Sequence, residues 1–201
     1  LAAYDLSGEL LFYTELHTLQ EGGHFVNDVT VDNKGNAYVT DSYAGILYKV
    51  TPEGQAEIFL NSPALAPMPP AFGMNGIDYD PRGFLIVSRA DTNSLLRIPL
   101  DRPGAYSEVQ LDAELFSPDG IYFKSPNELL VVSGDFGEEN ARLHTFKTTD
   151  KWESANLVEE FLTPNKGITT VTMRRNVPYV LVAHLEILIG GGFTDTFTIL
   201  K

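Results

Sequence analysis

The sequence predicts an all-β fold, a β-propeller built from repeated four-stranded blades. A strand–turn–strand pattern occurs in residues 26–42, 74–91 and 118–135, and it recurs about every 45 residues, the period of propeller blades. Within each copy, apolar and polar residues alternate as in a half-buried strand. No segment keeps a helical periodicity, which excludes folds that need long helices between strands, such as the TIM barrel and the Rossmann fold.

The composition limits the classes of partner. Of 201 residues, 43% are hydrophobic, enough for one domain with a sizeable core. The 27 acidic residues outnumber the 14 basic ones and give a net charge of −13, which disfavours nucleic acid and anionic membrane surfaces and favours cations. A solvated acidic surface is the plainer interpretation. The absence of Cys excludes disulfides, thiolate metal sites and Cys nucleophiles.

The expected partner is therefore a small-molecule substrate, with no nucleic acid and no membrane. No apolar run reaches the roughly 18 residues of a membrane span. The chain begins at Leu1 in what resembles mid-strand sequence, so we expect a fragment or a processed product. No targeting segment is visible, which leaves the compartment open, secreted or cytoplasmic.

The first 62 residues contain one partial blade and one complete blade. Residues 1–23 predict the outer half of a blade, two strands joined at Ser7-Gly8. The first complete blade is expected in residues 24–62, with strands at 29–31, 37–40, 46–50 and 56–60. Residues 61–73, rich in Pro and Ala, predict an inter-blade loop, a kind of connection that often carries binding residues.

Three further copies repeat this order. The second blade is expected in residues 63–113, with strands at 77–79, 85–88, 95–99 and 108–111. The third is expected in 114–164, with strands at 121–123, 129–132, 143–147 and 157–161. The last copy is weaker and is expected in 165–201, with strands at 169–173, 178–182 and 193–200.

Each clear copy opens with a polar residue directly before its first apolar strand: Asn27, Asn75 and Asp119. The innermost strand of a blade runs beside the central channel, so the start of that strand should lie at one mouth of the channel. We therefore expect these three openers to converge there. Asn-Gly and Asp-Gly are also turn dipeptides, so a purely structural role is the alternative.

A second set of residues follows the openers at one fixed spacing: Asp41, Arg89 and Ser133. The second strand of each blade returns to the same face, so these residues should form a ring just outside the openers. Asp135 and His184 are expected near this ring. We accordingly predict that Asp41, Arg89 and His184 bind substrate.

Plainer roles compete with these predictions. Arg89 either binds an anionic substrate group or pairs with Asp91. His24 can reach the channel mouth from its loop, although a loop histidine is more often plain surface. His144 in mid-strand is expected to be structural, and Trp152 is expected to pack a blade edge.

The openers suggest a cation site. Asn and Asp oxygens that converge on one axis are the donors of a hard cation, and calcium takes six to eight such oxygens. One carboxylate with two amides leaves the cation electrophilic enough to polarise a carbonyl or phosphoryl oxygen. Asp119, the ionisable member, can serve as ligand, general base or nucleophile. Calcium is the cation expected first, with Zn²⁺, Mg²⁺ and Mn²⁺ as alternatives.

Three segments carry a family likeness: FVNDVTVDNKGNAYVTDSYAGILYKV, MNGIDYDPRGFLIVSRAD and SPDGIYFKSPNELLVVSG. They resemble the senescence marker protein/gluconolactonase family, whose relatives include diisopropyl fluorophosphatase and luciferin-regenerating enzyme. The resemblance implies a six-bladed propeller, about four and a half blades of which are in this chain, with one divalent metal in the channel, usually calcium. By that likeness Asn27, Asn75 and Asp119 match three of the four metal ligands, and Asp119 matches the carboxylate with a catalytic role.

The chain departs from the family pattern at its beginning. The family's fourth ligand, a glutamate on the first blade, has no match here. About 90 residues would be missing at the N-terminus, given about 45 per blade. A second polypeptide or an N-terminal segment outside this sequence is expected to complete the propeller.

The function expected from the residues and the resemblance is a divalent-metal-dependent hydrolase of a lactone or a related ester. A phosphotriesterase-type hydrolase and a non-catalytic binding propeller are the alternatives, because a propeller fold does not imply an enzyme. A strictosidine-synthase-like condensing enzyme would need a channel glutamate acting as base, and the sequence offers no candidate.

Overall fold

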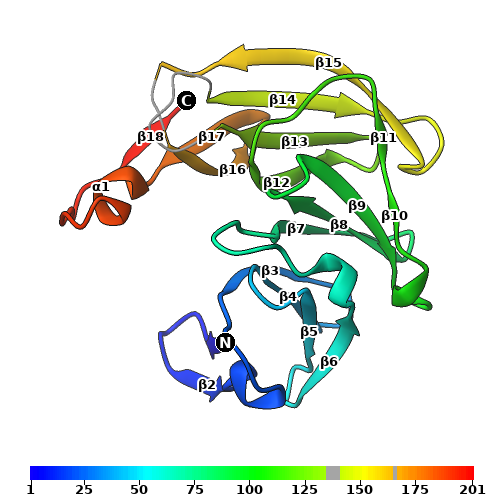
Figure 1. Cartoon of the computed structure of the whole chain (residues 1–201), viewed down its shortest axis with the longest axis vertical. Helices are drawn as coiled ribbons and strands as arrows, with labels where there is room; N and C mark the ends of the chain where they lie inside the picture. Colours follow the sequence, from blue (N-terminus) through cyan, green and yellow to red (C-terminus); the bar gives the residue numbers. More distant parts are fainter. Residues whose placement is uncertain (135–140, 165–166) are drawn as a thin grey trace.

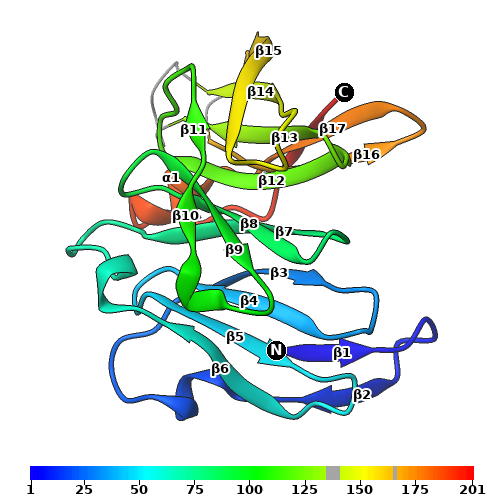
Figure 2. The ribbon, with the colours of Figure 1, turned by 90° about the vertical axis from the view of Figure 1, so that its right-hand side faces the viewer.

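The computed structural model describes residues 1–134, 141–164 and 167–201. The strands form twisted sheets that follow one another around an open arc, with the N-terminal hairpin at one end and the last sheet at the other (Figure 1). Turned by 90°, the same sheets lie one above another along the long axis (Figure 2). The described part of the chain is an all-β partial propeller, which confirms the predicted fold class. Asp135 lies outside the described residues.

The arc begins with a hairpin of β1 (Ala2–Tyr4) and β2 (Leu10–Tyr13). The first four-stranded sheet has the order β3 (Val26–Val31), β4 (Ala37–Asp41), β5 (Ile46–Val50) and β6 (Ala56–Asn61). The second has β7 (Met74–Asp80), β8 (Phe84–Arg89), β9 (Ser94–Pro99) and β10 (Ser107–Glu108).

The third sheet contains β12 (Pro118–Ser125), β13 (Glu128–Ser133), β14 (Arg142–Lys147) and β15 (Ser154–Leu162), with β11 (Gln110–Leu111) added at its outer edge. The last contains β16 (Ile168–Arg174), β17 (Val177–Val182) and β18 (Thr198–Leu200). The short helices are η1 (Leu16–Leu19), η2 (Pro63–Leu65), η3 (Pro103–Ala105) and α1 (Leu185–Ile189). The inner strands β3, β7, β12 and β16 contact one another in this order.

The predicted strands agree with the structure except at two places. The strand expected at 108–111 is divided, because β10 pairs with β9 whereas β11 runs parallel to β15 of the third sheet. Val109, which lies between β10 and β11, is buried in the core. The chain passes from the second sheet to the third at this residue. The strand expected at 193–200 is confined to Thr198–Leu200, and residues 185–189, for which no strand or helix was expected, form α1.

The core lies between neighbouring sheets. Phe84 of β8 and Trp152 before β15 belong to one buried cluster between the second and third sheets. The indole Nε1 of Trp152 donates a hydrogen bond to the carbonyl of Pro126 (3.0 Å), so this ring joins two loops as well as two sheets. Leu47 and Leu85 belong to the cluster between the first and second sheets. Each sheet is therefore stabilised mainly by burial against the next one.

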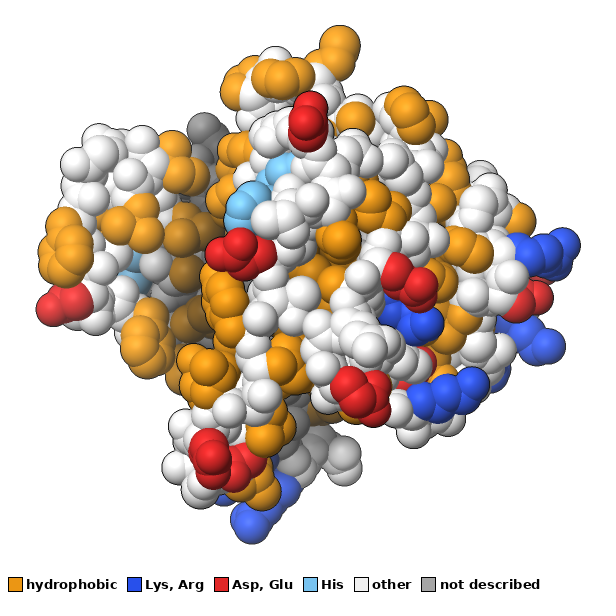
Figure 3. Space-filling view, turned by 90° about the horizontal axis from the view of Figure 1, so that it is seen from below, with side chains coloured by type: hydrophobic (Ala, Val, Ile, Leu, Met, Phe, Trp, Pro, Cys, Tyr) orange, Lys and Arg blue, Asp and Glu red, His pale blue; other side chains and the backbone are white. Residues whose placement is uncertain are grey.

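Apolar side chains stay exposed at the beginning of the arc. Leu10, Leu11 and Tyr13 of β2 are exposed, as is Val31 of β3. Figure 3 views the molecule from below Figure 1 and shows hydrophobic side chains spread over much of that face. Such surfaces are typical of faces that contact another part of an assembly. Among the described helices, none has the length and apolar character needed to cross a membrane.

Candidate functional site

Each inner strand opens with a β-bulge at the polar residues singled out from the sequence. In β3, Asn27 and Asp28 together oppose a single residue of β4, Thr40. The same break in register falls at Asn75 in β7 and at Asp119 in β12. A bulge bends the strand and re-aims its side chains. The openers therefore do not follow the in-and-out alternation of the strands behind them.

Buried hydroxyl groups tie each bulge to the next sheet. Thr40 Oγ1 donates to the carbonyl of Asn75 (2.7 Å), and Ser88 Oγ donates to the carbonyl of Asp119 (2.7 Å). The hydroxyl of one sheet thus positions the opener of the next. Thr40 and Ser88 were not singled out from the sequence. A hydroxyl residue stands at this place in only two copies of the repeat, because the third copy has Val132 there.

The glycines of the Asn-Gly and Asp-Gly pairs permit close contact between inner strands. A Cβ atom on Gly76 would lie 2.3 Å from the carbonyl oxygen of Asp119, and one on Gly120 would lie 2.6 Å from the Cα of Thr170. No side chain fits at either place. These glycines therefore serve packing between sheets, whereas the polar residue before each is left to face the channel.

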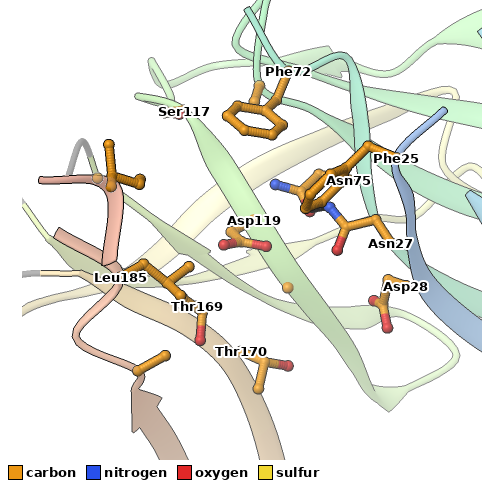
Figure 4. Close-up of a pocket in the computed structure, with 15 residues that line it drawn as sticks. Phe25, Asn27, Asp28, Phe72, Asn75, Ser117, Asp119, Thr169, Thr170 and Leu185 are labelled. Atoms are coloured by element: carbon orange, nitrogen blue, oxygen red, sulfur yellow. Dashed lines mark hydrogen bonds between the residues drawn. The ribbon is translucent and has the colours of Figure 1, made fainter. Parts of the chain in front are cut away.

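The three openers line one cavity of about 500 Å³, a size usual for small-molecule sites. In Figure 4 the Asp119 carboxyl lies between the amides of Asn27 and Asn75 on one side and Leu185 on the other. The convergence expected from the sequence is thus seen in the structure. The remaining lining is largely apolar and includes Phe25, Phe72, Ala90, Ala183 and Ile189.

The two amides contact each other across neighbouring sheets. Asn27 Nδ2 donates to Asn75 Oδ1 (2.7 Å) and to Ser42 Oγ (2.9 Å). Ser42 in turn donates to the carbonyl of Met74 (2.7 Å), beside the second opener. Among the described residues, no hydrogen bond engages Asn27 Oδ1 or Asn75 Nδ2, so one acceptor and one donor remain for a ligand.

Asp119 is the chemically unusual group of the cavity. Burial and, second, the neighbouring Asp28 carboxylate raise the pKa of Asp119 to about 8, against the backbone N–H of Gly120, which lowers it. Within the described residues, no side chain donates a hydrogen bond to its carboxyl. A carboxyl in this setting is protonated at neutral pH until a cation or a strong donor reaches it.

Asp28 supplies a second carboxyl to the cavity. Its oxygens accept from the backbone N–H groups of Val29 (2.8 Å) and of Ile77 on the next inner strand (3.1 Å). Burial raises the pKa of Asp28 despite these bonds. Asp28 was not singled out from the sequence, because its hydrogen-bond partner Ile77 belongs to another blade.

Asp41 is completely buried and saturated with hydrogen bonds. It accepts from the backbone N–H groups of Phe25 (3.0 Å) and Tyr43 (3.0 Å), from the hydroxyl of Tyr48 (3.0 Å) and from His24 Nδ1 (2.7 Å). Burial opposes ionisation, but these donors outweigh it and hold the pKa of Asp41 below its usual value. Asp41 therefore fixes the backbone around the cavity rather than facing it.

The surroundings of His24 favour its protonated form. Its Nδ1 faces the Asp41 carboxylate and its Nε2 faces the carbonyl of Gln20 (2.8 Å), so both nitrogens meet acceptors. Partial burial disfavours the charge, but the hydrogen bonds to Asp41 and Gln20 raise the pKa of His24. The resulting ion pair is buried at the base of the loop that leads into β3.

The other ring positions also turn away from the cavity. Arg89 pairs with Asp91 through two hydrogen bonds, the second of the roles considered from the sequence. Ser133 Oγ contacts His144 Nε2 (2.8 Å) inside the third sheet. His184 precedes α1 and lies 3.3 Å from a carboxylate oxygen of Glu186.

The structure thus brings the three openers together but not the predicted substrate residues. Asp41, Arg89 and His184 are not among the described residues that line the cavity. The apolar walls come instead from aromatic residues in the loops before β3 and β7. Direct substrate binding by Asp41, Arg89 and His184 stays a prediction, and the contacts seen here favour an indirect role.

The donor set fits a hard cation only in part. Asn27, Asn75 and Asp119 offer neutral and anionic oxygens, which suit calcium or magnesium better than zinc. Across the described ranges, no three His, Cys, Asp or Glu side chains are arranged to hold a metal by themselves. A cation at this place would depend on amide oxygens and on water or substrate to complete its shell.

No protein-family model and no curated protein matches the chain. The fold is similar to regucalcin, described as a calcium-binding protein, from Agrobacterium tumefaciens (TM-score 0.64, 18% identity, 90% of this chain and 60% of that chain). It is also similar to virginiamycin B lyase from Staphylococcus aureus (0.61, 15%, 89% and 54%) and to the allergen Mala s 1 from Malassezia sympodialis (0.61, 20%, 80% and 50%).

These likenesses support a propeller fold without selecting one propeller family. At such low identities they carry no statement about activity. The chain spans between 50% and 60% of the length of these three neighbours, so the activity of any whole propeller is a matter for proposal.

Proposed function

We propose that this chain forms part of a divalent-cation-dependent hydrolase that acts on a lactone or a related ester, of the senescence marker protein/gluconolactonase type. One observation carries the proposal. Asn27, Asn75 and Asp119, from three successive inner strands, line one cavity in which the Asp119 carboxyl has no side-chain donor among the described residues. The calcium-binding neighbour regucalcin makes calcium the first cation to test.

The roles of the residues follow from their chemistry. When bound, a calcium ion would polarise the carbonyl oxygen of the ester. Asn27 and Asn75 would hold the cation through amide oxygens, which add no charge, and Asp119 would hold it through its carboxylate. In its ionised form Asp119 would act in one of two ways. As a base it would take a proton from water, whose oxygen bonds to the carbonyl carbon while the ester C–O bond breaks and the alcohol leaves with a proton. As a nucleophile it would bond to that carbon itself while the alcohol leaves, and water would then hydrolyse the acyl intermediate. Asp41 and Arg89 would contribute to specificity indirectly, by fixing the loops around the cavity.

Calcium binding and hydrolysis should be measured together. A panel of lactones, aryl esters and phosphotriesters is assayed with calcium and with a chelator, and calcium binding is followed by calorimetry. We expect calcium-dependent hydrolysis that falls about 100-fold or more in Asp119→Asn and Asn75→Ala, the usual effect of removing an acid–base group. Asp101→Asn, at an exposed carboxylate outside the cavity, is the matched control. Activity that survives both the chelator and Asp119→Asn would contradict the proposal.

A non-catalytic binding propeller is the second candidate. The observation that favours it is the hydrogen bond from Asn27 to Asn75, which engages Asn75 Oδ1, one of the oxygens that a cation would need. In that case ligands of the cavity would bind equally well with calcium and with a chelator, and no member of the panel would be hydrolysed.

A further inference from the structure

Three aromatic rings form an exposed cluster at the cavity. Phe25, Tyr43 and Phe72 lie with ring centroids 5.4 Å apart in each of their pairs, and Tyr43 stacks on Phe72. Phe25 and Tyr43 are each 43% exposed. Rings that pack only against one another at a surface leave faces available for an apolar ligand. Phe25 and Phe72 line the cavity, and Tyr43 contacts both rings without being among the lining residues.

Buried hydrogen bonds hold this cluster in place. One carboxylate, Asp41, accepts the backbone N–H groups of both Phe25 and Tyr43 (3.0 Å each). The N–H of Ser42 donates to the carbonyl of Phe25 (2.9 Å), and the N–H of Gly73 donates to the carbonyl of Ser42 (2.8 Å). The three loops that carry the rings are therefore fixed to one another before any ligand arrives, which lowers the cost of ordering them on binding.

The distribution of polarity across the cavity limits what it can bind. Polar side chains gather around Asn27, Asn75 and Asp119, whereas the walls are the aromatic cluster on one side and Leu185 and other aliphatic residues on the other (Figure 4). In the described part of the chain, no Lys or Arg lines the cavity. An anionic ligand would lack a counter-charge. Besides the openers, the polar residues of the lining are Asp28, Ser117, Thr169 and Thr170, whereas the Phe25 and Phe72 rings offer the hydroxyls of a sugar no hydrogen-bond partner.

We propose that the Phe25–Phe72 wall is the specificity subsite of the cavity and that it takes a neutral ligand with an aromatic or alicyclic ring and a single carbonyl-type head. The ring would pack on the wall, and the carbonyl would face the two amides and Asp119. This inference rests on the proposed function and narrows its substrate to apolar lactones and aryl esters rather than sugar lactones.

Binding is tested without turnover by using lactams, which keep the ring and the carbonyl but resist hydrolysis. The dissociation constants of 3,4-dihydroquinolin-2-one and of gluconolactam are measured by calorimetry or ligand-observed NMR. We expect the aromatic lactam to bind at least about tenfold more tightly, and Phe72→Ala to weaken its binding about tenfold, since stacking on a ring contributes on this scale. Phe72→Leu, which keeps apolar volume but removes the ring, should show an intermediate loss.

Phe161→Ala is the matched control, because Phe161 is an exposed phenylalanine on β15 outside this cavity. A preference for gluconolactam, or equal binding of the aromatic lactam by the wild type and by Phe72→Leu, overturns the subsite. The two proposals fail separately. Aromatic lactam binding without any calcium-dependent hydrolysis supports the subsite and contradicts the hydrolase. Hydrolysis that favours sugar lactones and is insensitive to Phe72→Leu supports the hydrolase and contradicts the subsite.

Discussion

Replacing Asp119 by Asn is expected to stabilise the protein when no divalent cation is present. Asn has the size of a protonated carboxyl and cannot ionise. In the folded protein Asp119 has a pKa of about 8, whereas in the unfolded chain it would be about 3.9. The folded state therefore keeps a proton that the unfolded chain releases, and the stability of the wild type falls as the pH rises from about 4 to about 8.

The size of the effect follows from the two pKa values. Each pKa unit corresponds to about 1.4 kcal/mol, and about three units separate the unfolded pKa from pH 7. At pH 7 the ionisation of Asp119 in the unfolded chain therefore lowers the free energy of unfolding of the wild type by on the order of 4 kcal/mol. Asp119→Asn does not have this loss. For a chain of this length the melting temperature should rise by about 10 °C in the variant. At about pH 4, where the unfolded carboxyl is about half ionised and the folded one is protonated, the difference should fall to about 0.5 kcal/mol.

Urea and thermal denaturation in the presence of a chelator, at about pH 4, 7 and 9, measure this difference. Asp150→Asn is a control of opposite sign. Hydrogen bonds from Ser154 and Thr148 lower the pKa of Asp150 to about 2, so its replacement should destabilise the protein at neutral pH. If Asp119→Asn is neutral or destabilising at pH 7, and its effect does not grow with pH, Asp119 is ionised in the folded protein and the account of the cavity is wrong.

Three further predictions concern the frame around the cavity. Gly76→Ala should lower the free energy of unfolding by about 2 kcal/mol or more, because its Cβ would meet the carbonyl of Asp119, while Gly104→Ala, with open space around it, is the control in urea denaturation. Equal losses in the two variants would refute the close contact. Ser88→Ala should cost about 1–3 kcal/mol, because the Asp119 carbonyl loses its buried donor, and an unchanged denaturation midpoint would contradict this. Asp41→Asn removes the negative charge that faces His24. The raised pKa of His24 gives the wild type stability that is full below the unfolded histidine pKa and is lost as the pH rises through the folded pKa. Melting curves of Asp41→Asn should lack this component, and a pH profile like that of the wild type would count against the ion pair.

The strands were predictable because apolar and polar residues alternate along them. The order of the strands followed from the blade repeat of about 45 residues. The cavity openers were predictable too, because Asn27, Asn75 and Asp119 stand at one place in each copy. Their bulges explain why the polar residue there departs from the alternation of the strand that follows it. These features are local, so they leave a mark in a short stretch of sequence.

The features that were missed depend on partners far away in the chain. The hydrogen bonds of Asp41 with His24 and Tyr48 were not foreseen, because these two residues come from other segments of the chain. Asp28 and Ser88 act through backbone groups of the neighbouring sheet, which no pattern within one blade reveals. The helix α1 was not predicted, because a short run of mostly apolar residues followed by glycines is too short to show a helical period.

Calorimetric titration of calcium into the protein at pH 7, repeated in two buffers of different ionisation enthalpy, tests the central claim most directly. The account predicts that a cation binds at Asn27, Asn75 and Asp119 and displaces the proton of Asp119, so that about one proton is released per cation. Asn75→Ala should lose most of the affinity, and Asp119→Asn should lose the proton release as well. The absence of binding heat, or binding without proton release that both variants retain, would contradict a cation site at the inner-strand openings.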